Sequence, residues 1–507
     1  MKKTIIYVLM VMIFGLVSCE DFLSKENKNG FDESTYMEFS SQAKEVVISI
    51  YDVLNYSGFQ HWGFQVLGEA PSDNIVNDWG DGQWGPHVVN LYNYNWQGDN
   101  LFIVLRWNNA YKGIYRANYL LSKIDEVTDI SDEDYNTYTG EALFLRAYYY
   151  YSLVIGFGDI PLLTEIPTPE MANSISKNPE SEIWEQIVSD LEEATVLLPD
   201  TYDGDENLGR VTSGAAWGML SRVYLWTKDY AGAVEAANEV ESLGYGLVDG
   251  DEYYRMFNGT MKNSSESVFE SQQAGEFGAW FSKSGAEGAI TMHTSPRVSW
   301  ARYLRPVNGT NNPAGIDLRD IFELADKRRK GSFLVSFEDS IDYGGVMGIY
   351  PDTSAFGDFR LDLQVAGAYN VRKYLPSDPA NWVKGRWTAF STNIPLIRFS
   401  EVLINKAEAQ NELNNVAGAF STIEAVRVRA GLDMTGISNG DQAAMKLLLE
   451  NERRIEFLFE GHRWFDLKRW GKLNEALPAA GLNYVDGVHQ YWPIPSQELS
   501  LNPGLGD

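Results

Sequence analysis

Three glutamates spaced four residues apart are the feature of the chain that most suggests chemistry. Glu452, Glu456 and Glu460 share one ridge of a predicted helix, where each like-charge pair weakens an isolated helix by about 0.2–0.5 kcal/mol. Such a ridge can bind a metal ion or serve as a catalytic carboxylate site. Alternatively, cations pair with it in an internal ion-pair network. Three arginines are at hand for this: Arg453, Arg454 and Arg463.

The ion-pair network is the better interpretation. A di-iron bundle requires Glu-x-x-His, and no glutamate stands three residues before His462. The sequence also lacks the H-E-x-x-H motif. Structural ion pairs commonly imitate functional sites. We therefore expect no metal, no cofactor and no enzyme, although 70 acidic residues leave a glycosidase-type carboxylate pair open as an alternative.

The elements around the ridge are predicted to be helical. Apolar residues recur at helical spacing from Leu448 to Phe459, Gly461 interrupts the pattern, and Trp464 begins a second short apolar series. Helical periodicity also covers residues 41–56, 101–127, 135–156 and 179–198. The fold class that we expect is therefore all-α.

An internal repeat refines this expectation. Trp217, Leu220 and Tyr224 have the spacing of a tetratricopeptide helix, and the following Ala231–Val240 is echoed 186 residues later by Ala417–Val426. Two helix pairs are too few for a free solenoid, because each pair needs neighbours to bury its apolar face. We expect the helices at 42–125 and 135–198 to supply those neighbours.

Two stretches lack this periodicity. Residues 55–100 contain four tryptophans among Gly, Asn and Asp, and residues 245–395 are rich in Gly, Asn, Ser and aromatics. Irregular regions of this length in a compact protein usually carry function. We predict one domain, residues 19–507, with a helical scaffold at about 33–245 and 395–475 and a loop-rich insert at about 245–395.

The N-terminus resembles a bacterial lipoprotein signal peptide, residues 1–18. Lys2 and Lys3 precede an apolar run from Ile5 to Val17 that is too short to span a bilayer comfortably. A small residue, Ser18, then precedes Cys19, the only cysteine. The resemblance implies cleavage before Cys19 and lipidation of its thiol, including palmitate, which anchors the chain to a membrane. An ordinary signal peptide that happens to contain a cysteine is the alternative.

Composition narrows the choice of partner. The formal net charge is −29, or −31 once Lys2 and Lys3 are removed with the signal peptide. This charge argues against nucleic acid as a partner. The 15 Trp, 28 Tyr and 24 Phe argue against disorder and exceed what a core alone needs, so we expect some aromatic side chains on the surface.

Five blocks in order then identify a family. They are CEDFL from Cys19, LRAYYYYSLVIGFGDIPL from Leu145, IRFSEVLINKAEAQNEL from Ile397, NERRIEFLFEGHRWFDLKRWG from Asn451 and YWPIPSQELSLNP from Tyr491. Together they resemble the SusD/RagB family of outer-membrane nutrient-binding lipoproteins. The resemblance runs from Cys19 to the C-terminus, and Asn451–Gly471 is its most specific part.

The resemblance implies a function. Members have a scaffold of four tetratricopeptide-like units with irregular ligand-binding loops. They sit on the cell surface as a lid over a SusC-like TonB-dependent outer-membrane transporter, and they bind oligosaccharides, or in some cases peptides, without catalysis. The implied role is capture of a glycan and its delivery to the transporter. Peptide capture by the same fold is the first alternative, and a surface glycosidase is the second.

The ligand site has to be argued from physical chemistry, because the five blocks belong to the scaffold. A sugar ring offers an apolar face and a rim of hydroxyls, which suit an exposed aromatic platform beside amides and carboxylates. Two stretches provide these groups, and a loop tryptophan packed on the scaffold is the alternative for each. The candidates are Asp73, Asn74, Asn77, Asp78, Trp79 and Trp84 in the first stretch, and Trp280 and Trp300 in the second.

Overall fold

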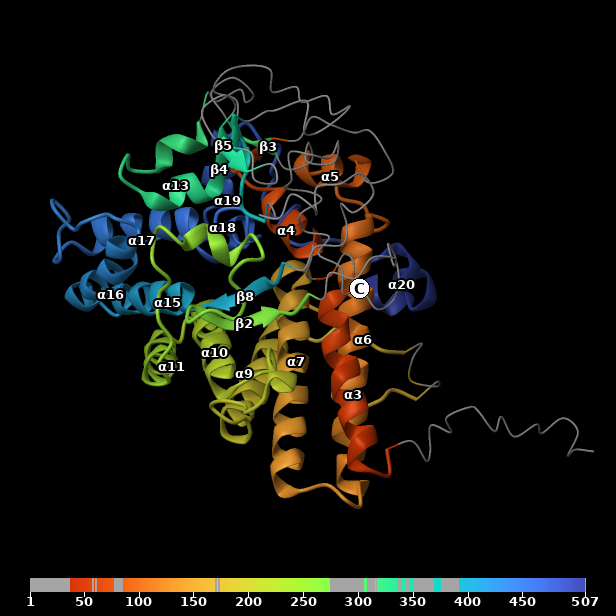
Figure 1. The fold of residues 1–507 in the computed structure, drawn as a ribbon. Coiled ribbons are helices and arrows are strands. Elements are labelled where there is room, and N and C mark those ends of the chain that lie inside the picture. The colour runs from red at the N-terminus through yellow and green to blue at the C-terminus, as the bar shows by residue number, and fades with distance from the viewer. Residues whose placement is uncertain are drawn as a thin grey trace, which may run out of the picture.

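Helices dominate the computed structural model of the chain, and most of the long helices that follow one another in sequence lie side by side (Figure 1). The structure describes residues 37–56, 59, 62–76, 85–168, 171, 174–273, 305–307, 315, 317–335, 340–342, 347–349, 369–374 and 392–506. The main helices are α3 (Ser40–Asp52), α6 (Leu101–Lys123), α7 (Asp132–Phe157), α9 (Glu180–Leu197), α10 (Ser213–Thr227), α11 (Tyr230–Ser242), α15 (Phe399–Glu412), α16 (Val416–Arg429) and α17 (Gln442–Glu456).

Eight of these helices form four packed pairs. α3 packs on α6, α7 on α9, α10 on α11 and α15 on α16, and contacts between α6 and α7, α9 and α10, and α11 and α15 join one pair to the next. The predicted neighbours of the internal repeat are therefore confirmed. The fold is the expected all-α scaffold of tetratricopeptide-like units.

Both copies of the repeat start their second helix in the same way. The carboxylate of Asp229 accepts a hydrogen bond from the backbone N–H of Gly232, at 3.0 Å, and caps α11. The amide oxygen of Asn415 accepts one from Gly418, at 3.1 Å, and caps α16. A side-chain cap of this kind satisfies an N–H that has no partner within the helix and typically contributes about 1 kcal/mol.

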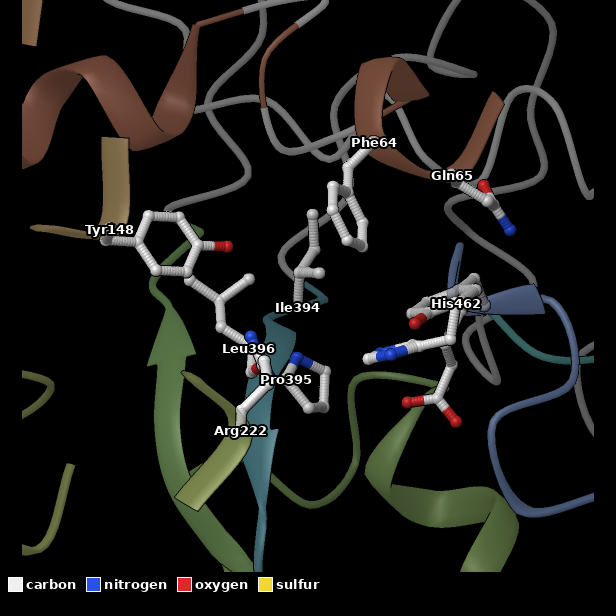
Figure 2. A pocket seen from close by; sticks show the side chains of 10 residues that line it. Phe64, Gln65, Tyr148, Arg222, Ile394, Pro395, Leu396 and His462 are labelled. Atoms are coloured by element: carbon white, nitrogen blue, oxygen red, sulfur yellow. The ribbon is translucent and has the colours of Figure 1, made fainter. Parts of the chain in front are cut away.

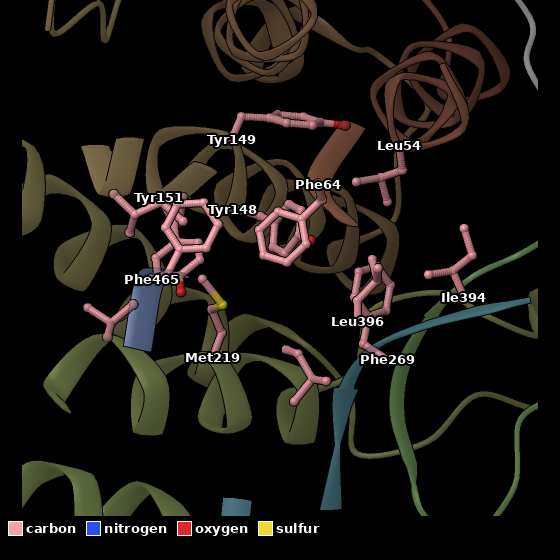
Figure 3. Packing of buried hydrophobic residues seen from close by; sticks show 14 of the residues in the cluster. Leu54, Phe64, Tyr148, Tyr149, Tyr151, Met219, Phe269, Ile394, Leu396 and Phe465 are labelled. Atoms are coloured by element: carbon pink, nitrogen blue, oxygen red, sulfur yellow. The ribbon is translucent and has the colours of Figure 1, made fainter. Parts of the chain in front are cut away.

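α7 lies at the centre of the scaffold and is buried on every side from Thr137 to Phe157. Tyr148, Tyr149 and Tyr151 fill the space between α7 and its neighbours (Figure 3). The hydroxyl of Tyr149 donates to the carbonyl of Ile50 at 2.6 Å, so its burial leaves no polar group unpaired. An apolar surface on all sides is what a buried central helix requires.

The interpretation of residues 55–100 as a long loop was wrong in part. Two helices, α4 (Trp62–Glu69) and α5 (Gly85–Tyr92), and a short strand, β1 (Ile75–Val76), interrupt it. α4 buries Phe64, Val66 and Leu67. Eight residues make about two turns, too few for a helical period to stand out in a sequence.

The loop-rich insert contains short strands. They are β2 (Ser267–Ser271), β3 (Arg305–Pro306), β4 (Phe333–Val335), β5 (Ser340–Asp342), β6 (Met347–Ile349), β7 (Tyr369–Val371) and β8 (Ile394–Arg398), and one short helix, α13 (Lys327–Ser332), precedes β4. β2 pairs antiparallel with β8, and Ser271 faces Ile394. The chain therefore enters and leaves the insert along one ladder on the scaffold.

The C-terminal part returns to the centre through α18 (Arg463–Arg469), α19 (Leu473–Ala479) and α20 (Ser496–Leu501). Between α17 and α18, Gly461 has φ +87°, as its predicted role in interrupting the helix requires. α4 packs directly on this turn, because a Cβ on Gly68 would lie 1.8 Å from the Gly461 carbonyl oxygen. No helix within the described ranges is both long and apolar enough to cross a membrane.

Candidate functional site

The glutamate ridge is an internal ion-pair network, as predicted. Glu452, Glu456 and Glu460 are 1%, 0% and 8% exposed. The cations that pair with them define, together with the ridge, what we call the ridge network: Arg328, Lys373, Arg398, Arg427 and Arg429. The prediction that Arg453, Arg454 and Arg463 supply the cations was wrong, because Arg453 pairs with Asp466 and the other two pair with Asp73.

In the ridge network, ion pairing lowers the pKa of Glu456 more than burial raises it. Burial alone raises the pKa of Glu456, but Arg429, Arg398 and Arg328 outweigh it and hold this pKa well below its usual range. Arg398 alone donates to Glu266, Glu456 and Glu460. Glu456 therefore stays ionised at neutral pH, and Arg398 binds all three carboxylates, which suits a scaffold and not proton transfer.

The ridge network also fastens the insert to α17. Arg328 lies in α13, and its guanidinium donates to Glu456 at 3.1 Å. Lys373 follows β7, and its ammonium donates to the Glu456 carbonyl at 2.9 Å and to Glu460 at 2.8 Å. Both cations come from the loop-rich part of the chain, so their burial holds that part against the scaffold.

Two predicted site residues, Asp73 and Asn74, lie inside the protein. Asp73 is 7% exposed, and its two carboxylate oxygens accept from Arg463 at 2.7 and 2.9 Å. Burial acts to raise the pKa of Asp73, but Arg454 and Arg463 hold it far below its usual range. Asn74 is fully buried, and its amide oxygen accepts from Arg454 at 2.9 Å.

Glu69 completes this cluster, and sequence reasoning missed it. One carboxylate oxygen accepts from the Gly461 backbone N–H and the other from the Asn74 amide, each at 3.1 Å. Burial raises the pKa of Glu69 to about 7. A lone carboxylate among the apolar residues of α4 was the available signal. We call residues 69–76 the root segment, because the chain continues from it into the other candidates of the first stretch, residues 77–84.

The remaining candidates lie outside the described residues: Cys19, Asn77, Asp78, Trp79, Trp84, Trp280 and Trp300. Their roles stay predictions. The described residues nevertheless relate the two stretches. β1 pairs antiparallel with β3, with Val76 opposite Arg305. The last residue of β1, which precedes Asn77, therefore lies beside the first residue of β3. The stretch that contains Trp300 leads into that first residue.

A small cavity lies between α4, the turn after α17, and β8. Tyr148 and His462 stand on opposite sides of it, with Phe64 and Gln65 above (Figure 2). It has room for about one water molecule. The Gln65 amide oxygen is buried and has no hydrogen-bond partner among the residues that the structure describes. Burial lowers the pKa of His462 well below its usual range. A neutral imidazole and an unpaired acceptor suit a bound water.

Comparisons with known proteins agree with this architecture. A family model described as "Starch-binding associating with outer membrane" matches residues 21–225, and the SusD family model matches residues 362–506. The chain belongs to the SusD/RagB family. Its similarity extends over whole proteins: a SusD-like protein of Formosa agariphila is 25% identical over 100% of this chain and 98% of its own length.

Solved structures give the same result. A laminarin-binding SusD-like protein superposes with a TM-score of 0.75 and 27% identity, covering 92% of this chain and 98% of its own. A SusD-like protein from Bacteroides fragilis superposes with a TM-score of 0.75 and 25% identity, covering 94% and 97%. The family is one of carbohydrate-binding proteins associated with the outer membrane.

Proposed function

We propose that this chain is a non-catalytic glycan-binding protein of the outer-membrane surface. It is anchored through lipid on Cys19, captures an oligosaccharide or polysaccharide, and delivers it to a SusC-like TonB-dependent transporter. Family membership supports the class, and the five sequence blocks support the anchor and the partner.

One observation supports the location of the site. The β1–β3 ladder joins the start of the stretch from Asn77 to Trp84 to the end of the stretch that contains Trp280 and Trp300. The two aromatic, amide-rich stretches are therefore attached to neighbouring strand ends of one ladder, which supports a single ligand for both. Trp79 and Trp84 supply the platform, and Asn77 and Asp78 bind the hydroxyl rim.

Calorimetric titration of the full chain in detergent tests the function. The panel holds laminarin, other plant and microbial polysaccharides, and a peptide mixture, and each incubation is also analysed for products. We expect binding to one polysaccharide without products. Released oligosaccharides would favour the glycosidase, and heat from peptides alone would favour peptide capture.

Single tryptophan variants test the site. Trp79→Ala or Trp84→Ala should weaken binding at least about tenfold, because truncating a central aromatic anchor typically costs 2 kcal/mol or more. Trp226→Ala is the matched control, since this half-buried tryptophan belongs to α10 on the scaffold. Unchanged affinity in both Trp79→Ala and Trp84→Ala would remove these residues from the site.

A further inference from the structure

The polar groups of Asn74 are all in use within the protein. Its backbone N–H donates to the Ser72 hydroxyl at 3.2 Å, and its carbonyl accepts from the Val307 N–H at 3.0 Å. Its side-chain oxygen accepts from Arg454, and its side-chain nitrogen donates to Glu69. A fully buried amide with these four bonds does not face a ligand. It joins α4, β3 and α17 at one point.

The orientation of this amide is set by its two side-chain partners. Arg454 can only donate, so it faces the amide oxygen, and an ionised Glu69 can only accept, so it faces the amide nitrogen. Arg454 also contacts Asp73, through a 3.0 Å ion pair and a 3.2 Å hydrogen bond to the backbone carbonyl. The cluster therefore holds the backbone directly before β1. β1 has two residues, and the chain then continues to Asn77.

We propose that Asn74 and Glu69 are positioning residues for the ligand site: their side-chain hydrogen bond holds β1 in the register from which the binding stretch leaves. The inference rests on the proposed function for its ligand. Asn74, which the sequence predicted to contact the ligand, then supports the residues that make this contact. The neighbouring Asp73, paired with Arg463 and Arg454, holds the same segment.

A charge balance makes the proposal testable. The cluster contains two carboxylates, Glu69 and Asp73, and two guanidiniums, Arg454 and Arg463. Asn74→Asp adds a third carboxylate and replaces the donor that faces Glu69 with an acceptor. The other charged or titratable groups that act on Glu69 are Lys373 and Tyr374, which follow β7. Two carboxylates at hydrogen-bond distance share a proton once the pH is low enough.

Asn74→Asp should therefore weaken polysaccharide binding at least about tenfold at about pH 8 and recover to within about threefold of the wild-type affinity at about pH 5.5. The double variant Glu69→Gln with Asn74→Asp reverses the polarity of the hydrogen bond. The new amide at position 69 donates to the new carboxylate at position 74, while its oxygen still accepts from Gly461. This double variant should bind within about threefold of the wild type at both pH values.

Asn405→Asp is the matched control. Asn405 is also fully buried, and its oxygen accepts from Arg453, but its nitrogen faces the Ser221 hydroxyl, which can rotate to donate. We expect no pH-dependent loss of binding in this variant. Hydrogen exchange of the peptide that covers residues 70–84, in the full chain, provides a readout that needs no ligand. Its protection should fall in Asn74→Asp at about pH 8 and return in the double variant.

The outcomes separate the two claims. If the wild type binds no polysaccharide in the panel, the proposed function fails and hydrogen exchange alone decides this inference. If Asn74→Asp keeps wild-type affinity and protection at both pH values, the side-chain bond positions nothing. If affinity is lost equally at both pH values and in the double variant, Asn74 contacts the ligand or merely stabilises the fold, and the inference is overturned.

Discussion

Buried charges are treated in opposite ways in the ridge network and around α4. In the ridge network, Arg398 meets three carboxylates, and every glutamate of the ridge has a cation within ion-pair distance. Around α4, the donors to Glu69 among the described residues are both neutral, because Arg454 and Arg463 pair with Asp73. Arg106 is 1% exposed, and no carboxylate of the described residues pairs with it.

This difference indicates that the two regions differ in local stability. If one partner is removed from a cluster of paired charges, a buried charge remains whose desolvation cost nothing offsets. The ridge network therefore resists rearrangement. The α4 region contains two charged groups, Glu69 and Arg106, that have no ion-pair partner among the described residues. It also contains the root segment of the proposed ligand site. Segments that respond to ligands commonly come from the less stable part of a structure. We infer that the ridge network holds the fold and that the α4 region is the less stable of the two.

The largest effect should come from Arg398→Met. It leaves Glu266, Glu456 and Glu460 short of a buried cation, and breaking a buried pair in this way typically costs 3–5 kcal/mol. Urea unfolding followed by circular dichroism measures the loss. Arg255→Met is the control, because the Arg255–Glu252 pair is 46% exposed on each side and should contribute less than about 1 kcal/mol. Equal effects of both substitutions would refute the ranking.

Glu69→Gln should flatten the pH dependence of stability. The pKa of Glu69 is raised, chiefly by burial, to about 7 in the folded chain. The folded state therefore holds this proton more tightly than the unfolded state, whose carboxyl has the ordinary value of about 4.5. Glu69 thus contributes stability that is present below about pH 4.5 and is lost as the pH rises to about 7. The loss is about 3 kcal/mol.

The measurement is the free energy of unfolding of the wild type and Glu69→Gln at several pH values between about 5 and 8. Because the variant cannot ionise at position 69, its stability should fall less than that of the wild type across this range. Parallel curves for the two proteins would show that Glu69 does not titrate in this window, and the contrast with the ridge network would be lost.

The smallest expected effect is a gain of stability in Arg106→Met. Burial lowers the pKa of Arg106 to about 10, so the guanidinium is still charged at neutral pH. It donates to the Phe59 carbonyl at 2.8 Å and lies 4.4 Å from the Phe59 ring centroid, but its Nε and Nη1 have no hydrogen-bond partner within the described part of the chain. An apolar side chain of similar length should raise the unfolding free energy by about 1–2 kcal/mol. A decrease would mean that the contacts with Phe59 outweigh the burial of the charge.

The scaffold could be predicted from the sequence because its signals are local. The repeat at Ala231–Val240 and Ala417–Val426 and the apolar periodicity of α7 lie within single helices, so their spacing alone identifies them. α4 escaped detection because it is short. The predicted ion-pair network was confirmed, but its partners were not predictable. Arg398 and Arg328 lie 58 and 128 residues from Glu456, and a ridge of glutamates does not reveal which distant cations reach it.

The site was predicted less well for a related reason. Asp73 and Asn74 sit in a polar stretch that resembles an exposed loop, and only the fold brings Arg454 to Asn74 from 380 residues away. Polar residues in a loop can face solvent or satisfy a buried cation, and the sequence pattern of the two cases is the same. The aromatic candidates Trp79, Trp84, Trp280 and Trp300 stay predictions, supported by the β1–β3 ladder that joins their two stretches.

Hydrogen exchange of the full chain, with and without the polysaccharide that titration selects, tests the contrast between the two regions most directly. Amides of α17 should exchange only through global unfolding. Those of the root segment should exchange at least about tenfold faster and should slow when the polysaccharide binds, because they open locally beneath the ligand site. Root-segment amides that exchange as slowly as α17 and do not respond to the polysaccharide would contradict the account.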